Sequence, residues 1–433
     1  MALRTHWRND YFSRSMRFLS ITAFFSALSA FALAPAFGEP EFPSFRAAPH
    51  EYLKRTPNDA FTQVLDDIHS GKAKLDHTSE KAYLKSLMGT LGISPSSQLL
   101  VFSTTSLQLS RISPRNPRAI YFNEDVYLGW VPGGQIEMIG IDPQWGAITY
   151  MYDLPRTETH PEILRATRCM NCHASSDVGG APGLLISSVV PGPGGGSLDA
   201  FRQERTGHGI PFSERFGGWH LTGKHGIDEH WGNLTGELSP AGLRKIANPL
   251  GQSFRLDRYP VATSDVLAHL LLEHQVGFIN RFISATYRAR AVLAGTVPEI
   301  APPQTDAFLD AEAAALVRYA LFAQEAKFPS GGIAVDPELS RHFLSRAQRT
   351  KKGLSLRDFD LKTRIFKHRC SYMVRSASFQ GMPKELKARV FHHMDLALRV
   401  DNPLPAYAYL PAAEKRAIRE ILRQTLSGLP KGW

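Results

Sequence analysis

Five consecutive residues, Cys169-Met170-Asn171-Cys172-His173, form a C-x-x-C-H motif, the attachment signature of a c-type haem. Two thiols three positions apart lie on one turn of a helix, where they can add to the two vinyl groups of a single haem. The next residue then brings an imidazole beneath the iron. The spacing therefore predicts that Cys169 and Cys172 form thioethers and that His173 is the proximal iron ligand.

Two other interpretations of the motif are a redox-active dithiol and half of a zinc site. A thioredoxin-like dithiol would lie in a βαβ context, which the flanking residues do not suggest. A structural zinc site needs four Cys or His ligands, usually with a second close pair, whereas the only other cysteine is Cys370. An odd cysteine of this kind is more often a buried thiol than a reactive one. We therefore favour covalent haem, provided that the chain is exported.

The N-terminal segment is typical of a secretory signal. Residues 1–38 combine four arginines, an apolar stretch over 18–37 and the small residues Ala36 and Gly38, so we expect cleavage near Gly38. The alternative is an uncleaved membrane anchor, because the apolar stretch is nearly long enough to span a bilayer. No later segment has 18 uninterrupted apolar residues, and we expect a soluble periplasmic protein.

The residue opposite His173 decides between electron transfer and catalysis, because a strong sixth ligand closes the iron and an open position admits a small molecule. Histidines are dense after the motif, at His208, His220, His225 and His230. Our first distal candidate is His225, with His208 as a second. Glycines around Trp219 could let the backbone approach a flat cofactor, and the indole could pack on the porphyrin.

Two weaker distal candidates lie farther along the chain. His274 shares a predicted helix face with Leu267, Leu270 and Phe278, where a histidine is more often a core residue than a ligand. Met382, in Gly-Met-Pro, is similar to the loop methionine of small cytochromes c, but it is far from the motif in sequence.

A proline-fixed loop contains Arg111, Arg115 and Arg118. Haem propionates need guanidinium partners, so these arginines are candidate cofactor-binding residues. The alternative is an ordinary surface loop.

Hydrophobic periodicity predicts the elements that position these residues. Alternating apolar residues predict an antiparallel meander with strands at 99–102, 119–122, 126–131, 136–141 and 147–152. Helical spacing predicts helices within 51–92 and at 161–168, 262–294, 305–326, 337–349, 384–399 and 411–426. Residues 174–260 show little regular pattern, and we interpret them as wrapping the haem.

The fold class that follows is α+β, with an antiparallel β-meander, a loop-rich haem c segment and a mainly helical C-terminal region. The predicted organisation is a signal peptide at 1–38, an N-terminal helical segment at 39–95, a β-rich region at 96–155, a haem c-binding segment at 156–260 and a helical region at 261–433.

Charge is unevenly distributed. Residues 341–433 carry 20 lysines and arginines against 7 acidic residues, whereas the haem-bearing part is mildly acidic. A basic face could steer an acidic redox partner or contact a membrane surface, although a solvated helix surface is the simpler interpretation. Nucleic acid is not an expected partner in an exported protein.

These features together resemble a group of large exported proteins that are described as cytochrome c domain-containing and carry one haem motif. The resemblance covers about 95–430 and rests on the segments 111–130, 169–173, 217–226, 272–275 and 369–372. It implies one covalent haem, with its iron, and a periplasmic or surface location, but no substrate. It also adds weight to His225 and His274 as distal residues and removes some from Met382.

Three functions remain open. The first and favoured one is a monohaem protein that transfers electrons to or from a redox protein or a small molecule. The second is a peroxidase-like haem-c oxidoreductase with an open or weakly held distal site, and the weakest is a haem-based sensor or binding module.

Overall fold

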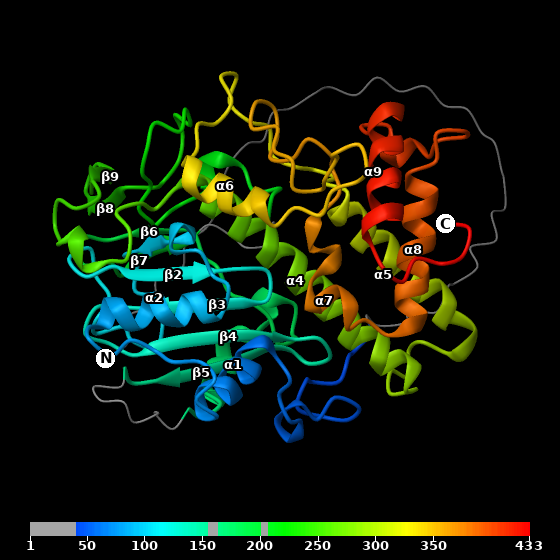
Figure 1. Ribbon diagram of the computed structural model, residues 1–433, viewed down its shortest axis with the longest axis horizontal. Coiled ribbons are helices and arrows are strands. Elements are labelled where there is room, and N and C mark those ends of the chain that lie inside the picture. Colours follow the sequence, from blue (N-terminus) through cyan, green and yellow to red (C-terminus); the bar gives the residue numbers. More distant parts are fainter. Residues whose placement is uncertain (1–39, 155–162, 201–206) are drawn as a thin grey trace, which may run out of the picture. The chain divides into compact units, whose positions relative to one another are not determined.

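A five-stranded antiparallel sheet forms the centre of the fold (Figure 1). The computed structural model describes residues 40–154, 163–200 and 207–433. Each strand lies beside the one that precedes it in the chain. The strands are β1 (Leu99–Val101), β2 (Arg118–Phe122), β3 (Val126–Trp130), β4 (Ile136–Asp142) and β5 (Gly146–Tyr152). The predicted meander is thereby confirmed, with every strand end within one residue of its expected place.

Two N-terminal helices, α1 (Ala60–His69) and α2 (Glu80–Thr90), lie over one face of the sheet (Figure 1). The hydroxyl of Tyr150 on β5 donates a 2.5 Å hydrogen bond to Asp59, whose carboxylate also caps the first turn of α1. The region 51–92, expected to be helical, therefore contains two helices with an irregular segment between them.

The second face of the sheet carries alternate residues of its strands and is crossed by α4 (Val266–Leu293; Figure 1). The register places Glu137 of β4 directly opposite Met151 of β5 on this face. Tyr127 of β3 points the same way, and its hydroxyl donates to Gln275 of α4 at 2.9 Å. This face and this helix enclose the candidate site.

Helix α4 is buried along almost all of its 28 residues, which confirms the prediction of a central helix over 262–294. Apolar residues lie on nearly every face, as a helix surrounded by protein requires. Asp265 caps its first turn by accepting a 2.9 Å hydrogen bond from the amide of Leu267.

Most of the other helices described lie in the C-terminal half. They are α5 (Thr305–Ala320), α6 (Pro337–Ser345), α7 (Ala377–Gln380), α8 (Lys384–Ala397) and α9 (Ala412–Thr425). Helix α5 ends before its predicted limit at 326, because Phe322 and Gln324 adopt left-handed conformations with φ of 58° and 68°.

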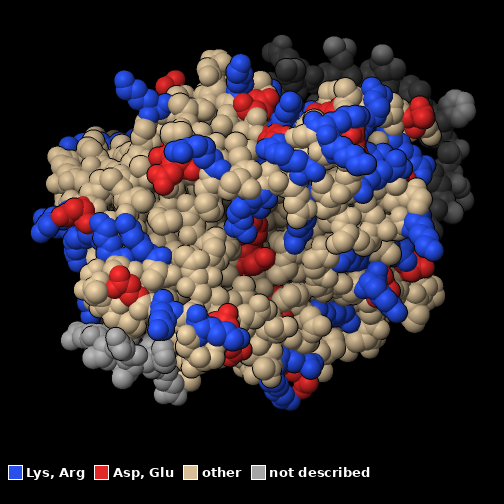
Figure 2. Space-filling model, viewed as in Figure 1, with Lys and Arg blue, Asp and Glu red and all other residues tan. Residues whose placement is uncertain are grey.

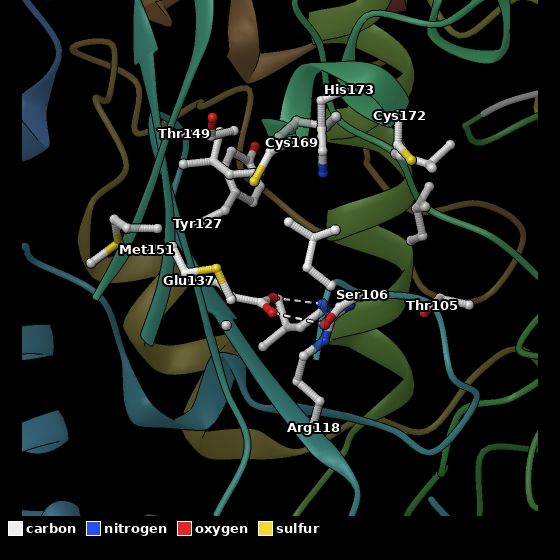
Figure 3. Close-up of a pocket in the computed structure, with 18 of the residues that line it drawn as sticks. Thr105, Ser106, Arg118, Tyr127, Glu137, Thr149, Met151, Cys169, Cys172 and His173 are labelled. Atoms are coloured by element: carbon white, nitrogen blue, oxygen red, sulfur yellow. Dashed lines mark hydrogen bonds and ion pairs between the residues drawn. The ribbon is translucent and has the colours of Figure 1, made fainter. Parts of the chain in front are cut away.

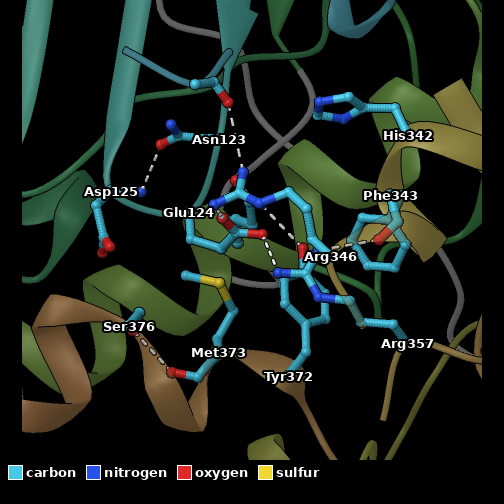
Figure 4. Close-up of polar contacts among 12 residues, drawn as sticks. Asn123, Glu124, Asp125, His342, Phe343, Arg346, Arg357, Tyr372, Met373 and Ser376 are labelled. Carbon is cyan, nitrogen blue, oxygen red and sulfur yellow. Dashed lines mark hydrogen bonds and ion pairs between the residues drawn. The ribbon is translucent and has the colours of Figure 1, made fainter. Parts of the chain in front are cut away.

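The C-terminal region is joined to the sheet at the turn between β2 and β3 (Figure 4). Glu124 in this turn pairs with Arg357 at 2.5 Å and with Arg346 at 3.1 Å. The neighbouring Asp125 accepts a 2.9 Å hydrogen bond from the amide of Ala377. Two adjacent carboxylates thus hold three segments that are far away in sequence.

The segment after the motif is more regular than its sequence indicated. It contains the hairpin β6 (Val189–Pro191) and β7 (Ser197–Ala200) and the hairpin β8 (Leu234–Ser239) and β9 (Gly242–Ala247). The other described residues of 174–260 lie mostly outside helices and strands, as the sequence indicated.

The helix expected at 161–168 is not found over the residues described from 163 on, where Thr167–Cys169 form a 3-10 turn. The preceding backbone pairs with β5 instead, since the amide of Ala166 donates to the carbonyl of Thr149 at 2.8 Å and Tyr150 bridges Arg165. Tertiary pairing overrides the local helical pattern. The predicted signal segment 1–38 lies outside the described residues.

The fold is α+β. Residues from Pro40 to the C-terminus form one compact unit with a continuous core to which the sheet, α4 and the C-terminal helices all contribute. The predicted β-rich, haem-binding and helical segments are therefore parts of one body. Among the residues described, no helix is both long and apolar enough to cross a bilayer.

Candidate functional site

A cavity of about 580 Å³ lies between the second face of the sheet and α4 (Figure 3). Its other walls are the turn that carries the C-x-x-C-H motif, residues 184–187, and the loop that contains Ser106, Leu107 and Leu109. Leu272 and Val276, one turn apart on α4, close its side. Cavities of this volume hold small molecules and cofactors.

The three reactive residues of the motif all line this cavity. Cys169, Cys172 and His173 lie on one turn formed by a 3-10 segment and α3 (Met170–His173). Met170, between the two cysteines, points into the core and anchors the turn. Both cysteines are free thiols rather than a disulfide. Figure 3 shows the imidazole of His173 directed into the cavity, with a cysteine on either side.

A hydrogen bond from a side chain of the sheet holds this turn in place. The side-chain hydroxyl of Thr149 on β5 donates to the carbonyl of Ala166 at 2.8 Å, three residues before Cys169. Burial first, and then the nearby charge of Glu137, raise the pKa of the Cys169 thiol. Cys169 is therefore protonated at neutral pH.

The imidazole of His173 is oriented by the backbone ten residues farther along. Its Nδ1 lies 3.1 Å from the carbonyl oxygen of Gly183, and the amide of Gly183 donates to the carbonyl of His173 at 2.7 Å. Because a carbonyl can only accept, Nδ1 carries the proton and Nε2 keeps its lone pair. Burial lowers the pKa of His173, which favours this neutral form. A hydrogen bond of this kind is how proteins orient metal-binding histidines.

Asn280 of α4 holds the carbonyl of Gly183 in place. Its side-chain amide accepts from the amide of Leu184 and donates to the carbonyl of Leu184, both at 2.8 Å. A Cβ on Gly183 would lie 2.5 Å from the Asn280 oxygen, so glycine is required for this close approach. Asn280 of the central helix therefore fixes the backbone at Gly183, and the carbonyl of Gly183 in turn orients the imidazole of His173.

A partly buried ion pair lies across the cavity from His173 (Figure 3). Glu137 of β4 and Arg118 of β2 approach to 2.7 Å, and both line the cavity. Glu137 also accepts hydrogen bonds from Ser106 at 2.7 Å and Gln108 at 2.9 Å. Burial acts to raise the pKa of Glu137, but the Arg118 charge and these hydrogen bonds outweigh it and lower the pKa. The carboxyl is therefore ionised at neutral pH.

Sequence reasoning missed Glu137. It lies in an ordinary strand pattern, and only the register of β4 against β3 and β5 brings it to the cavity. The sequence pattern that could have identified Glu137 is a single charged residue within a strand of mostly apolar residues.

Two of the predicted cofactor-binding side chains outside the motif also line the cavity. Arg118 is one, although its guanidinium is paired with Glu137. Trp219 is the other, and its indole nitrogen donates to the carbonyl of Ser187 at 2.9 Å. Arg111 and Arg115 do not line it, and both lie in the exposed loop before β2.

The glycines beside Trp219 lie against other segments of the chain. A Cβ on Gly217 would lie 2.0 Å from the carbonyl oxygen of Val189, and one on Gly218 would lie 2.5 Å from the Ser103 hydroxyl. They allow two backbone segments to approach each other, whereas the expectation was close approach to a cofactor.

The four distal candidates do not line the cavity. His208 and His274 contact each other, Nδ1 to Nδ1 at 2.9 Å, in the core on the far side of α4, where His274 also reaches the Ser371 hydroxyl at 2.7 Å. The Nδ1 of His225 accepts from the amide of Ile227 at 3.2 Å, and Met382 is buried in the core. The density of histidines thus reflects packing and loop hydrogen bonds.

Cys370 is fully buried, and burial raises the pKa of its thiol to about 12. Within the described ranges, no group of three or more His, Cys, Asp and Glu side chains is arranged to hold a metal ion on its own.

No protein-family model, no curated protein and no solved structure matches this chain.

Proposed function

We propose that this protein is an exported c-type cytochrome that binds one haem covalently and transfers electrons. The observation that carries the proposal is the convergence of Cys169, Cys172 and His173 on one cavity, with the Nε2 lone pair of His173 left free by the hydrogen bond to Gly183. The cysteines would hold the haem through two thioethers, and His173 would be its axial ligand.

The cavity wall supports a flat apolar occupant. Leu107 and Leu109 line it, yet 51% and 57% of their surfaces are exposed. Two exposed leucines at the edge of one cavity form an apolar surface of the kind that a ligand can cover. A porphyrin held by the motif would cover them, and the indole of Trp219 offers an aromatic surface on the same wall.

The bound haem supplies one-electron chemistry, and the surrounding residues determine how it is used. Cys172 is exposed while His173 is partly buried, so the turn that would hold the haem reaches the surface at Cys172. This arrangement supports electron exchange with a docked partner, since neither a substrate nor a proton need enter the cavity. The C-x-x-C-H motif and the N-terminal signal pattern both fit a periplasmic location.

The basic C-terminal region is a weaker indication of the partner. Figure 2 shows lysines and arginines predominating over much of the surface formed by residues 341–433. Several are already paired, including Arg389 with Asp310 at 2.8 Å and Arg369 with Glu414 at 2.7 Å. The residual positive charge favours an acidic redox partner by steering.

A second function, a haem-c oxidoreductase, is favoured by the Glu137–Arg118 pair. An ionised carboxylate and a guanidinium on the wall across from His173 are groups that could bind and polarise a small molecule. Among the described residues that line the cavity, no second histidine is present to close the iron.

Optical spectroscopy of the purified protein, expressed with a haem c maturation system, tests the proposal and separates the two functions. Electron transfer predicts reversible one-electron oxidation and reduction, followed as reversible changes in the Soret and visible bands. Failure to cycle reversibly would contradict it. Rapid turnover of hydrogen peroxide would instead support the oxidoreductase.

A further inference from the structure

We propose that Glu137 and Arg118 form a binding site for a small uncharged ligand that carries an N–H or O–H group, and that this site disfavours anions. The inference rests on the proposed haem, because the ligand would bind between the iron and this pair. It names the two residues that select the ligand and the chemical class that they select.

The geometry of the pair leaves one acceptor position for a ligand. Oxygen Oε1 of Glu137 accepts from both Ser106 and Gln108, whereas Oε2 accepts only from Arg118. A carboxylate oxygen can accept two hydrogen bonds, so Oε2 has one lone pair left. Gly129, directly opposite Glu137, leaves this side open, since a Cβ there would lie 3.1 Å from Oε2.

The pair also contains an unused donor. The Nε–H of Arg118 is buried and has no hydrogen-bond partner among the described residues. Glu137 is 21% exposed and Arg118 is 13% exposed, and both line the cavity. A ligand that donates a hydrogen bond would complement the open oxygen of Glu137, whereas the buried Nε–H of Arg118 is closed off from the cavity.

The charges determine which ligands are excluded. The carboxylate of Glu137 is ionised, and one of its oxygens keeps an open lone pair on the cavity wall, whereas the Arg118 charge is directed at Glu137. An anion placed beside the open oxygen of Glu137 would be repelled by the carboxylate, and in a site of low dielectric this repulsion is strong. A neutral protic molecule, for which hydrogen peroxide is the simplest model, has no such penalty.

Two other hydroxyl groups of the sheet that line the cavity are already engaged. The hydroxyl of Tyr127 already donates to Gln275, and that of Thr149 already donates to Ala166. Ile120 and Ile139 are apolar. Selectivity between ligands should therefore depend on Glu137 and Arg118.

Two probes of opposite character test the inference on the full-length, haem-loaded ferric protein. Azide is an anion, and imidazole is uncharged and protic at about pH 8. Optical titration of each gives its dissociation constant. We expect Glu137→Gln to strengthen azide binding about tenfold, because a like charge is removed, and to weaken imidazole binding, because an amide oxygen is a weaker hydrogen-bond acceptor than a carboxylate. Arg118→Gln should weaken azide binding.

Ser106→Ala is the matched control, because it removes one hydrogen bond from the same carboxylate without changing any charge. It should change the ratio of the two affinities much less than Glu137→Gln does. Carbon monoxide binding to the reduced protein should be nearly the same in all variants, since that ligand has neither a charge nor an N–H or O–H group.

An unchanged ratio of azide to imidazole affinity in Glu137→Gln and Arg118→Gln would overturn the inference. Absence of azide binding in all variants would also overturn it, because the sixth position would then be closed. In both cases the haem spectrum would remain, so the result is distinct from failure of the proposed function, in which no haem is attached.

Discussion

The Nδ1 atom of His173 lies 3.1 Å from the carbonyl oxygen of Gly183. This contact sets the tautomer of the imidazole and joins the motif to the central helix, since Asn280 holds the next residue with two hydrogen bonds. A histidine with Nδ1 protonated and directed at a carbonyl presents Nε2 in a fixed direction. These hydrogen bonds are all made by residues of the chain, without a ligand.

Gly183→Ala tests this connection. The new Cβ would lie 2.5 Å from the side-chain oxygen of Asn280, so the backbone or Asn280 must move. We expect the free energy of unfolding to fall by about 1–3 kcal/mol. In the haem-loaded protein the midpoint potential should rise, because a weaker hydrogen bond makes the imidazole a poorer donor.

Gly89→Ala is the control for that substitution. Gly89 is exposed on α2, and a Cβ added there would have no other atom within 4 Å. Alanine there should stabilise the helix by about 0.5–1 kcal/mol. Equal stability of the two variants in chemical denaturation would contradict the proposed close contact at Gly183.

Buried histidines should make the protein sensitive to acid. Burial lowers the pKa of His269 to about 3, with smaller contributions from His230, Arg215 and His225, and lowers the pKa of His274 to about 3. Such a group is neutral when folded but binds a proton in the unfolded chain below pH 6.5. Stability is therefore fully present above that pH and is lost as pH falls from 6.5 towards 3.

At pH 5 each of these histidines should cost about 2 kcal/mol relative to neutral pH. Urea denaturation at a series of pH values measures the slope. His269→Phe keeps a ring against Trp219 and removes one titrating group, so its slope should be shallower than that of the wild type. An identical slope in the variant would show that His269 does not contribute.

The ion pairs of Glu124 should be structurally important. Glu124 joins the sheet to the C-terminal region through Arg357, and the side chains of both are largely buried. Glu124→Gln would leave Arg357 unpaired, and we expect a loss of about 3 kcal/mol in the free energy of unfolding. Glu420→Gln, which breaks the exposed pair with Lys352, should cost less than about 1 kcal/mol. Similar losses in both variants would argue against a special position for Glu124.

The sequence predicted the elements whose signals are local. Each strand of the meander shows its period within a few residues, and α4 is long enough for its apolar pattern to be clear. The motif also indicated its own residues, because C-x-x-C-H is a contiguous pattern. These features require no knowledge of distant contacts.

The wall across from His173 could not be predicted in the same way. Glu137 and Arg118 meet only because β2, β3 and β4 pair in a particular register. His208 and His274 are 66 residues apart in sequence, and their contact is a product of core packing. The density of histidines in the sequence is therefore a poor indicator of a distal ligand, because His208, His225 and His274 do not line the cavity.

The most direct test of the central claim is the intact mass of the protein expressed with a haem c maturation system, measured under denaturing conditions. We predict that the mass of the mature chain is increased by one haem, and that the alkaline pyridine spectrum shows both vinyl groups saturated. Cys172→Ala should carry at most one thioether, with the shifted spectrum that one remaining vinyl group produces. A mass equal to that of the polypeptide alone, or two saturated vinyl groups in Cys172→Ala, would contradict the account.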